Sequence, residues 1–354
     1  MKHLISILTQ VVLITMMTVA QTPQLKQLPA NQDVNIEVQR IWSNGEYCSF
    51  TSFAKYKGKY FVSFRESNSH QILKPEDQNG KARIIYSEDG REWKSSALIA
   101  KEGYDLRDPK ISIMPDGRMM LIMGGCVYKN CKREAVETWV CFSDDGEHFS
   151  ELQPVVFPDE VAHGNEFLWR ITWHDGVGYG VSYGSFFSLI KTTDGIHYEL
   201  VSHINMPGFP NESTIRFLSD GTMAMMVRRE NDSKNGAFGL SKPPYVQWKW
   251  NDMDVRLGGP DFMLTSDSTM IVASRSMYST EKTMLFSGDT RGKIEEVCIL
   301  PSGGDDNSYT GMLVEGDQLW VTYYSKHEGP KASIYLAKVP LKLFQSGVTS
   351  RYFY

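Results

Sequence analysis

Several features that define other protein classes are missing from this sequence. Beyond its first twenty residues it has no apolar run near the ~18 residues of a membrane helix, and it shows almost no helical periodicity. The formal net charge of −5 gives no basis for binding nucleic acid or an anionic membrane. No CxxC pair or His/Cys cluster has the spacing of zinc ligands. We therefore expect neither membrane insertion nor a nucleic-acid partner, and no metal or other cofactor is implied.

Cysteine is also scarce, with five residues in the whole chain. Cys126 and Cys131 flank a short segment at an expected hairpin tip, so a local disulfide is one interpretation. The other interpretation is that all five thiols are reduced and scattered, several of them in the core.

Residues 1–20 have the features of a secretory signal peptide. A short basic start precedes a mostly apolar stretch, and Thr18-Val19-Ala20 offers a small-residue cleavage site. We expect cleavage after Ala20 and a secreted or periplasmic protein comprising residues 21–354. Its roughly 334 residues suffice for one large β domain or two smaller ones, and we expect a single, monomeric domain.

The mature chain has the pattern of short β-strands separated by turns about 8–12 residues apart. The turns contain triplets such as Pro115-Asp116-Gly117 and Ser219-Asp220-Gly221. The expected strands are Tyr60–Phe64, Arg83–Tyr86, Ile111–Met114, Met119–Met123, Thr138–Phe142, Gly178–Tyr183, Met270–Ser274, Leu319–Tyr324 and Ser333–Val339. The pattern predicts an all-β protein.

One turn motif recurs three times, as SEDGREW from Ser87, SDDGEHF from Ser143 and TDGIHY from Thr193. In each copy the aspartate should accept backbone N–H bonds across the turn, and the glycine should take a positive φ. The aromatic residue three positions after the glycine should pack under the next strand.

The aspartates of the motif, Asp89, Asp145 and Asp194, are 56 and 49 residues apart. A period near 50 residues in an all-β chain is typical of a four-stranded propeller blade. We predict a six-bladed β-propeller, with five blades and longer loops as the alternative. The three aspartates should then occupy equivalent turns of successive blades, on the outer rim away from the central funnel.

Residues Asn211–Glu230 predict a β-hairpin that turns at Ser219-Asp220-Gly221. Glu212 lies at the entrance of its first strand and Arg228-Arg229 at the exit of its second. Because the strands are antiparallel, these residues should share one end of the sheet.

The turn motif resembles a short form of the Asp-box, or BNR, repeat of the sialidase (neuraminidase) superfamily. Other marks of that superfamily follow in chain order over nearly the whole mature chain. They are Arg65 (first arginine of the triad), Glu212 with Arg228 (the glutamate and second arginine), Arg275 (third arginine) and Tyr309 (nucleophile). The resemblance implies a six-bladed exo-glycosidase of acidic sugars.

The chain also departs from the superfamily pattern. Arg65 stands in FRES rather than FRIP, and each repeat is one residue shorter. The acid/base aspartate has only Asp77 as a match in order, twelve residues after Arg65. Asp108, in DLRDPK, instead resembles the RDP motif of five-bladed glycosidases, whose carboxylate points into the funnel. His70 is a third candidate for the acid.

Blade-innermost strands surround one funnel, where sites form. Arg65, Arg275 and one of Arg228 and Arg229 could meet there around one anion, since the guanidinium fork binds carboxylates bidentately. Consecutive strand residues face opposite sides, and we favour Arg228. The alternative is that each arginine has an acidic neighbour of its own, with Glu66, Glu230 and Asp261 as candidates.

Tyr309 beside Glu212 would form a nucleophile–base pair, and a tyrosine suits an anomeric carbon that carries a carboxylate. We therefore predict a retaining exo-glycosidase acting on sialic acid or another 2-keto-3-deoxy acid. A glycosidase of neutral or uronic sugars using Asp108 and Glu212, or a non-catalytic glycan-binding propeller, are the alternatives. Further rim or funnel candidates, which could equally be blade packing, are Trp169, Arg170 and Tyr245.

Overall fold

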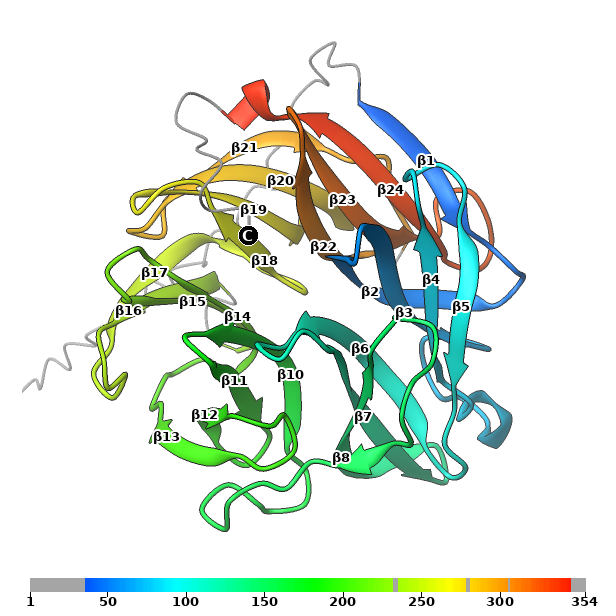
Figure 1. The fold of residues 1–354 in the computed structure, drawn as a ribbon, viewed down its shortest axis with the longest axis horizontal. Coiled ribbons are helices and arrows are strands. Elements are labelled where there is room, and N and C mark those ends of the chain that lie inside the picture. Colours follow the sequence, from blue (N-terminus) through cyan, green and yellow to red (C-terminus); the bar gives the residue numbers. More distant parts are fainter. Residues whose placement is uncertain (1–35, 232–234, 278–280, 305, 345–354) are drawn as a thin grey trace, which may run out of the picture.

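The computed structural model describes residues 36–231, 235–277, 281–304 and 306–344. They form a β-propeller of six four-stranded antiparallel sheets around one axis (Figure 1). The predicted all-β class and the six blades are confirmed, and the five-bladed alternative is wrong. The expected signal peptide lies outside the described residues. Within them, no helix has the length and hydrophobicity needed to cross a membrane.

Each blade runs outward from the axis, and consecutive strands along the chain are neighbours in the sheet. Blade 1 comprises β2 (Tyr47–Tyr56), β3 (Lys59–Ser67), β4 (Lys81–Ser87) and β5 (Lys94–Ile99). Blade 2 comprises β6 (Asp105–Ile113), β7 (Met119–Lys129), β8 (Lys132–Ser143) and β9 (Gln153–Pro154). Blade 3 comprises β10 (Phe167–His174), β11 (Val177–Tyr183), β12 (Phe187–Thr192) and β13 (Glu199–His203).

The second half of the chain repeats this order and closes the ring. Blade 4 comprises β14 (Pro210–Phe217), β15 (Met223–Arg229), β16 (Asn235–Ser241) and β17 (Lys249–Arg256). Blade 5 comprises β18 (Asp261–Leu264), β19 (Thr269–Met277), β20 (Glu281–Asp289) and β21 (Ile294–Ile299). Blade 6 comprises β22 (Ser308–Glu315), β23 (Gln318–Ser325), β24 (Ser333–Pro340) and, as its outer strand, β1 (Glu37–Trp42). Because β1 pairs with β24, the two ends of the described chain close the propeller in one sheet.

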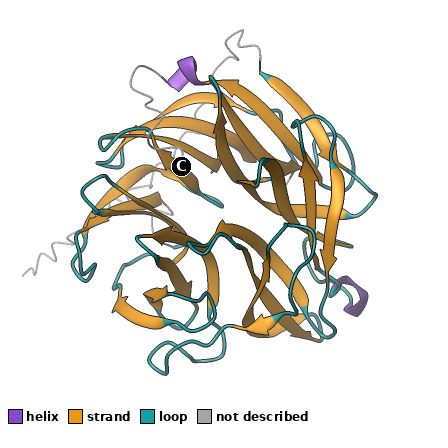
Figure 2. Ribbon diagram, viewed as in Figure 1, coloured by secondary structure: helices purple, strands orange, loops and turns teal. Residues whose placement is uncertain are grey.

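Helical structure is limited to two short 3₁₀ turns in the part of the chain that the structure describes (Figure 2). η1 (Pro75–Asp77) lies between β3 and β4, and η2 (Leu341–Phe344) follows β24. Every strand expected from the sequence lies in one of the observed strands, apart from Met114, one residue beyond β6.

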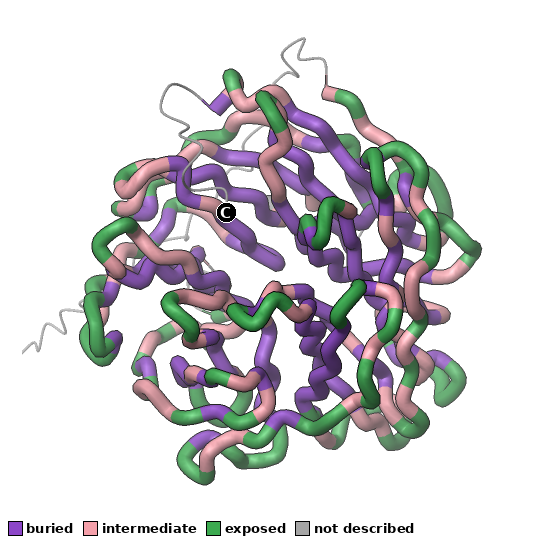
Figure 3. Tube along the Cα trace, in the orientation of Figure 1, coloured by how far each residue is buried: buried purple, intermediate pink, exposed green. Residues whose placement is uncertain are grey.

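The blades are held together by apolar clusters between neighbouring sheets and by hydroxyl groups near the axis. The inner and middle strands are largely buried and the outermost strands are half exposed (Figure 3). Close to the axis, Thr51 donates to the carbonyl of Tyr309 at 2.7 Å and Thr214 to that of Pro260 at 2.8 Å. These bonds satisfy backbone groups that the strand ladder leaves unpaired.

The three repeated turns have the same structure in blades 1, 2 and 3, where each connects the third strand to the fourth. Asp89, Asp145 and Asp194 each accept the backbone N–H groups two and three residues ahead, at 2.7–3.1 Å. A hydroxyl two residues before each aspartate completes the turn. In the third copy that hydroxyl is Thr192, one residue earlier than the sequence motif suggested.

The glycine of each turn packs against the preceding blade, which explains why no side chain stands there. Gly146 has a φ of +79°, and a Cβ added to it would lie 2.5 Å from the ring of Phe61 in blade 1. The turn therefore fixes both the local backbone and the contact between two blades. Because β3 and β4 are antiparallel, the turn after β4 lies at the opposite end of the blade from the end of β3.

All five cysteines are free thiols, so the interpretation of a Cys126–Cys131 disulfide is wrong. In the β7–β8 hairpin, Cys126 lies directly opposite Val136. Cys131 lies at the tip, between the paired residues Lys129 and Lys132. The hairpin register thus keeps the two thiols apart.

Candidate active site

A pocket of about 600 Å³ opens at the funnel end of the propeller, beside the end of β15 and the start of β14. Residues from five of the six blades line it. The charged lining residues are Asp108, Glu212, Glu230, Arg107, Arg133 and Arg228, and Phe50, His70, Tyr183 and Tyr309 are among the aromatic ones.

Backbone irregularities near the starts of the innermost strands direct several side chains toward this pocket. Five of the six innermost strands show a register shift there, whereas β18 does not. The residues at these positions include Phe50, Asp108, Trp169, Glu212 and Tyr309. Three of them have positive φ angles, of 65° for Phe50, 50° for Asp108 and 50° for Tyr309. Bulges of this kind re-aim side chains beside functional sites, and non-glycine residues adopt such angles only where the surroundings hold them.

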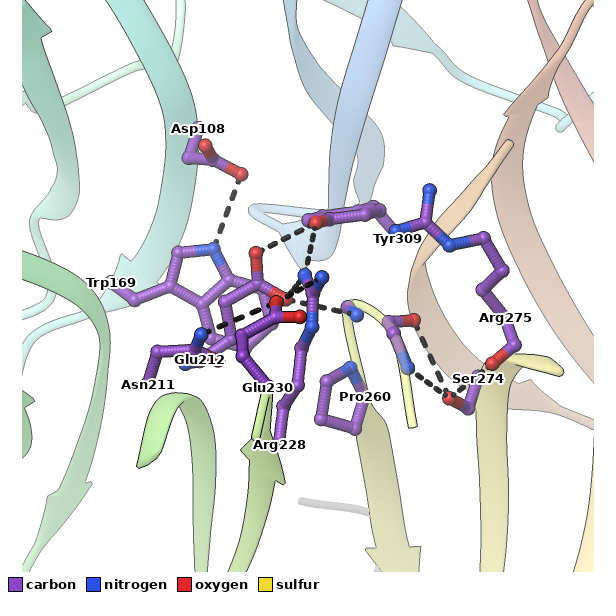
Figure 4. A network of polar contacts seen from close by, with 12 residues as sticks. Asp108, Trp169, Asn211, Glu212, Arg228, Glu230, Pro260, Ser274, Arg275 and Tyr309 are labelled. Atoms are coloured by element: carbon purple, nitrogen blue, oxygen red, sulfur yellow. Dashed lines mark hydrogen bonds and ion pairs between the residues drawn. The ribbon is translucent and has the colours of Figure 1, made fainter. Parts of the chain in front are cut away.

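Tyr309, Glu212 and Arg228 form a closed triangle at the base of the pocket (Figure 4). The Tyr309 hydroxyl donates to Glu212 Oε1 at 2.7 Å, and Arg228 Nη1 donates to Glu212 Oε2 and to Tyr309 Oη, both at 2.8 Å. The N–H of Gly259 gives Glu212 a further donor at 3.0 Å. The expected contact between Tyr309 and Glu212 is confirmed.

In this triangle the pKa values of Glu212 and Tyr309 are shifted in opposite directions. Burial alone would raise the pKa of Glu212, but Arg228 and the hydrogen bond from Tyr309 outweigh it, so that pKa lies below its ordinary value. Burial and the neighbouring Glu212 raise the pKa of Tyr309, although Arg228 opposes them. The resting state is therefore a neutral phenol bonded to an ionised carboxylate, the arrangement required of a general base and its nucleophile.

Asp108 lies across the pocket from Glu212, and its pKa is shifted in the opposite direction. Its Oδ1 accepts the indole N–H of Trp169 at 3.1 Å, and Lys110 Nζ is 3.7 Å away. Burial is the main cause that raises the pKa of Asp108, with Glu212 adding to it. Burial lowers the pKa of Lys110 to about 8. Two carboxyl groups with pKa values pushed apart are the pattern of an acid and a base in one site.

The predicted three-arginine clamp is not assembled in the pocket. Arg65 is fully buried and does not line it, because its Nε and Nη2 donate to Asp105 Oδ1 at 3.0 and 2.8 Å. Arg229 points to the other side of its strand and pairs with Asp252 at 2.7 Å. Arg228 is the member of the 228/229 pair that faces the site, as we favoured.

Arg275 lies behind Tyr309, with its guanidinium carbon 5.4 Å from the ring centroid. It pairs with Asp306 at 3.1 Å and does not line the pocket. Each arginine thus has an acidic neighbour, the alternative that the sequence left open. The partners are Asp105 for Arg65, Glu212 and Glu230 for Arg228, and Asp306 with Glu281 for Arg275.

The remaining candidates divide between the pocket and the scaffold. Asp77 is buried in η1, where its carboxylate accepts the N–H groups of Leu73 and Lys74 at 3.2 Å, and it does not line the pocket. Tyr245 is core, donating to the carbonyl of Gly221 at 3.0 Å. Arg170 pairs with Asp261, whereas His70 lines the pocket.

The sequence did not single out Arg107 and Arg133, which line the pocket, or Asp306, which pairs with Arg275. Arg107 is adjacent to the predicted Asp108, but the RDP resemblance points to the carboxylate alone. The sequence did carry one usable signal for the inner strands. Near their starts, five of these strands contain the four-residue segments SFTS, RDPK, LWRI, NEST and SYTG. When these segments are aligned, the second residue of each is the one at the bulge.

No protein-family model matches the chain, and no curated protein matches it in sequence. Solved structures do match in fold. A protein of unknown function from Dyadobacter fermentans superposes with a TM-score of 0.73 at 14% identity, over 87% of this chain and 99% of that one. The NanB sialidase of Streptococcus pneumoniae gives 0.66 at 11% identity, over 90% and 72% of the chains.

A third neighbour, Trypanosoma rangeli sialidase, was solved with 2,3-difluorosialic acid as a covalent intermediate. Its TM-score is 0.62 at 11% identity, over 82% of this chain and 54% of that one, so the present chain spans about half its length. The chain therefore has a propeller fold like that of the sialidases.

Proposed function

We propose that the protein is a retaining exo-glycosidase in which Tyr309 is the nucleophile, Glu212 its base and Asp108 the general acid. The observation that carries this proposal is the 2.7 Å hydrogen bond from Tyr309 to an ionised Glu212 inside a pocket. The sialidase-like fold, including a neighbour with a covalent sugar intermediate, supports it.

The first half of the reaction forms a tyrosyl–glycosyl bond. Tyr309 Oη attacks the anomeric carbon while its proton passes to Glu212, and the bond to the leaving oxygen breaks as Asp108 protonates that oxygen. Arg228, 2.8 Å from Oη, stabilises the phenolate charge that develops during proton transfer. In the second half, Asp108 takes a proton from water, the water attacks the anomeric carbon, and Tyr309 leaves with the proton from Glu212.

The substrate that we propose is a terminal acidic sugar, such as sialic acid or a related 2-keto-3-deoxy acid. A neutral phenol approaches an anomeric carbon that bears a carboxylate without the repulsion that an aspartate nucleophile would meet. Any sugar whose carboxylate lies next to the reacting carbon would favour a tyrosine nucleophile for the same reason.

A second candidate function follows from the two carboxyl groups alone. Asp108 and Glu212 line one pocket with pKa values shifted in opposite directions. That is also the composition of a glycosidase acting on neutral or uronic sugars through a carboxylate pair.

Turnover of an aryl sialoside by the purified protein, beside aryl glycosides of neutral and uronic sugars, tests the proposal. We expect release of the aryl alcohol from the acidic sugar with retention of the anomeric configuration in the first product. Turnover of neutral or uronic glycosides alone would favour the carboxylate pair. Binding of acidic sugars without turnover of any glycoside would indicate a glycan-binding propeller.

A further inference from the structure

One wall of the pocket, formed by blade 2, carries more positive than negative charge. Arg65 and Arg107 both face Asp105, at 2.8 Å and 3.5 Å, so two guanidinium groups share one carboxylate. The remaining partners of Arg107 are neutral, namely the Tyr128 hydroxyl at 3.1 Å and the His70 carbonyl at 3.2 Å. Arg107 lines the pocket and Arg65 does not.

Arg133 adds a second cation to the same wall. It lies directly opposite Tyr128 in the β7–β8 hairpin, and opposite residues of an antiparallel pair project on the same face. Arg133 is exposed, lines the pocket and has no acidic partner within 4 Å among the residues that the structure describes. The neighbouring carboxylates have other partners, since Glu134 faces Lys129 and Glu137 accepts from Tyr104.

The side of the site behind Tyr309 is already neutralised. Asp306 accepts from Tyr47 at 2.7 Å and from Tyr324 at 2.5 Å, and it pairs with Arg275 at 3.1 Å and with His70 at 2.6 Å. Both of its oxygens therefore have two partners. A substrate carboxylate placed against Arg275 would meet the resident charge of Asp306.

We infer that Arg107 and Arg133 form an oxyanion subsite, which binds a carboxylate or sulfate group of the glycan. Phe50 contacts both this subsite and Tyr309. Its ring centroid lies 5.0 Å from the ring centroid of Tyr309 and 5.3 Å from the guanidinium carbon of Arg107. The inference rests on the proposed function only in taking a glycan as the ligand. It assigns anion recognition to blade 2, in place of Arg65 and Arg275.

The test uses Arg133→Gln, with Lys132→Gln as the matched control. Lys132 is the adjacent exposed cation of the same hairpin and does not line the pocket. Each change is made in a Tyr309→Phe background, so that turnover cannot consume the ligand. Isothermal titration then measures the affinity for sialic acid, for a sulfated N-acetylhexosamine and for the same hexosamine without sulfate.

We expect Arg133→Gln to weaken binding of the anionic ligand about ten-fold, the contribution of one charge-assisted contact. Lys132→Gln should leave that affinity unchanged, and the neutral sugar should bind all variants alike. A loss for sialic acid would place the oxyanion on the terminal sugar, and a loss for the sulfated sugar alone would place it on a neighbouring one.

Equal affinities of the Arg133→Gln and Lys132→Gln proteins for both anionic ligands would overturn the subsite. The same conclusion would follow if Arg133→Gln weakened the neutral sugar as much as the anionic ones. Because titration needs no turnover, an inactive wild-type protein would count against the proposed reaction and leave this result interpretable.

Discussion

Two local structures recur around this propeller, a turn and a strand bulge. The turn repeats its residues, whereas the bulge repeats only its backbone geometry. At the outer turns of blades 1 to 3 the same residues recur, a hydroxyl followed by Asp-Gly, and they make the same short-range bonds. Near the start of the innermost strand in five blades the same backbone irregularity recurs, but the side chains at that position differ from blade to blade. Phe50, Asp108, Trp169, Glu212 and Tyr309 each occur once.

This difference separates scaffold from site. In blades 1 to 3 the turn joins the third strand to the fourth and packs on the previous blade with the same hydroxyl, aspartate and glycine, so its residues repeat. A bulge that directs a side chain toward the axis fixes only the direction and leaves the chemistry free. Of the five side chains at these positions, Phe50, Asp108, Glu212 and Tyr309 line one pocket, and the fifth, Trp169, donates to Asp108.

The largest expected effect comes from Tyr309→Phe, which removes the proposed nucleophile from its bulge. We expect kcat to fall by at least about 10⁴-fold, while binding of the anionic sugar remains. Adding Glu212→Gln should cost little more, because the two groups act as one unit. Steady-state kinetics of both variants and of the double variant measure this. Losses that multiply would instead mean that Glu212 acts independently of Tyr309.

Asp108→Asn should act through the leaving group. We expect kcat/KM to fall by up to about 10⁴-fold for a poor leaving group and far less for an activated aryl group that needs no proton. The raised pKa of Asp108 keeps it protonated into a higher pH range than an ordinary aspartate. Activity should therefore decline as the pH rises through that pKa, and the variant should lose this limb. An identical loss for both leaving groups would remove Asp108 as the acid.

Arg65→Met separates a buried scaffold pair from the site. Leaving Asp105 without its closest partner should lower the free energy of unfolding by about 3–5 kcal/mol, measured by denaturant titration. In protein that remains folded, kcat should stay near the wild-type value, because Arg65 does not line the pocket. Arg228→Met should instead lower kcat strongly and change the free energy of unfolding less than Arg65→Met does. A large loss of kcat in Arg65→Met without destabilisation would return Arg65 to the site, as its position in the sequence predicted.

The sequence was a good guide wherever the partners are close along the chain. The turn aspartates bond to groups two and three residues away, so the motif alone predicted their structure. The hairpin of β14 and β15 likewise brings Glu212 to Arg228, sixteen residues apart, through a single turn.

Across blades, the family resemblance predicted the contact between Tyr309 and Glu212, 97 residues apart, but the acidic partners of the arginines were not predicted. Arg65 is neutralised by Asp105, 40 residues away, and Asp306 accepts from Tyr47, 259 residues away. The adjacent residues in the sequence do not distinguish Arg65 from Arg107, because each arginine stands between an apolar and an acidic residue. Only Arg107 lines the pocket. The resemblance to the sialidases selected candidate site residues, but the burial of Arg65, which the sequence alone does not show, keeps it from lining the pocket.

The smallest effects should come from the repeated turns. Asp145→Ala and Asp194→Ala each remove an acceptor for two backbone N–H groups, a role like that of a helix N-cap, worth about 1 kcal/mol of unfolding free energy. Because the turns lie in different blades and share no partner, the two losses should add in the double variant. Neither should change kcat/KM, since the turns lie at the end of each blade away from the site. Gly146→Ala should cost more than either, because its Cβ would meet the ring of Phe61 at 2.5 Å. A change in kcat/KM in either aspartate variant, at temperatures well below unfolding, would show that these outer turns also influence the pocket, and the division between scaffold and site would not hold.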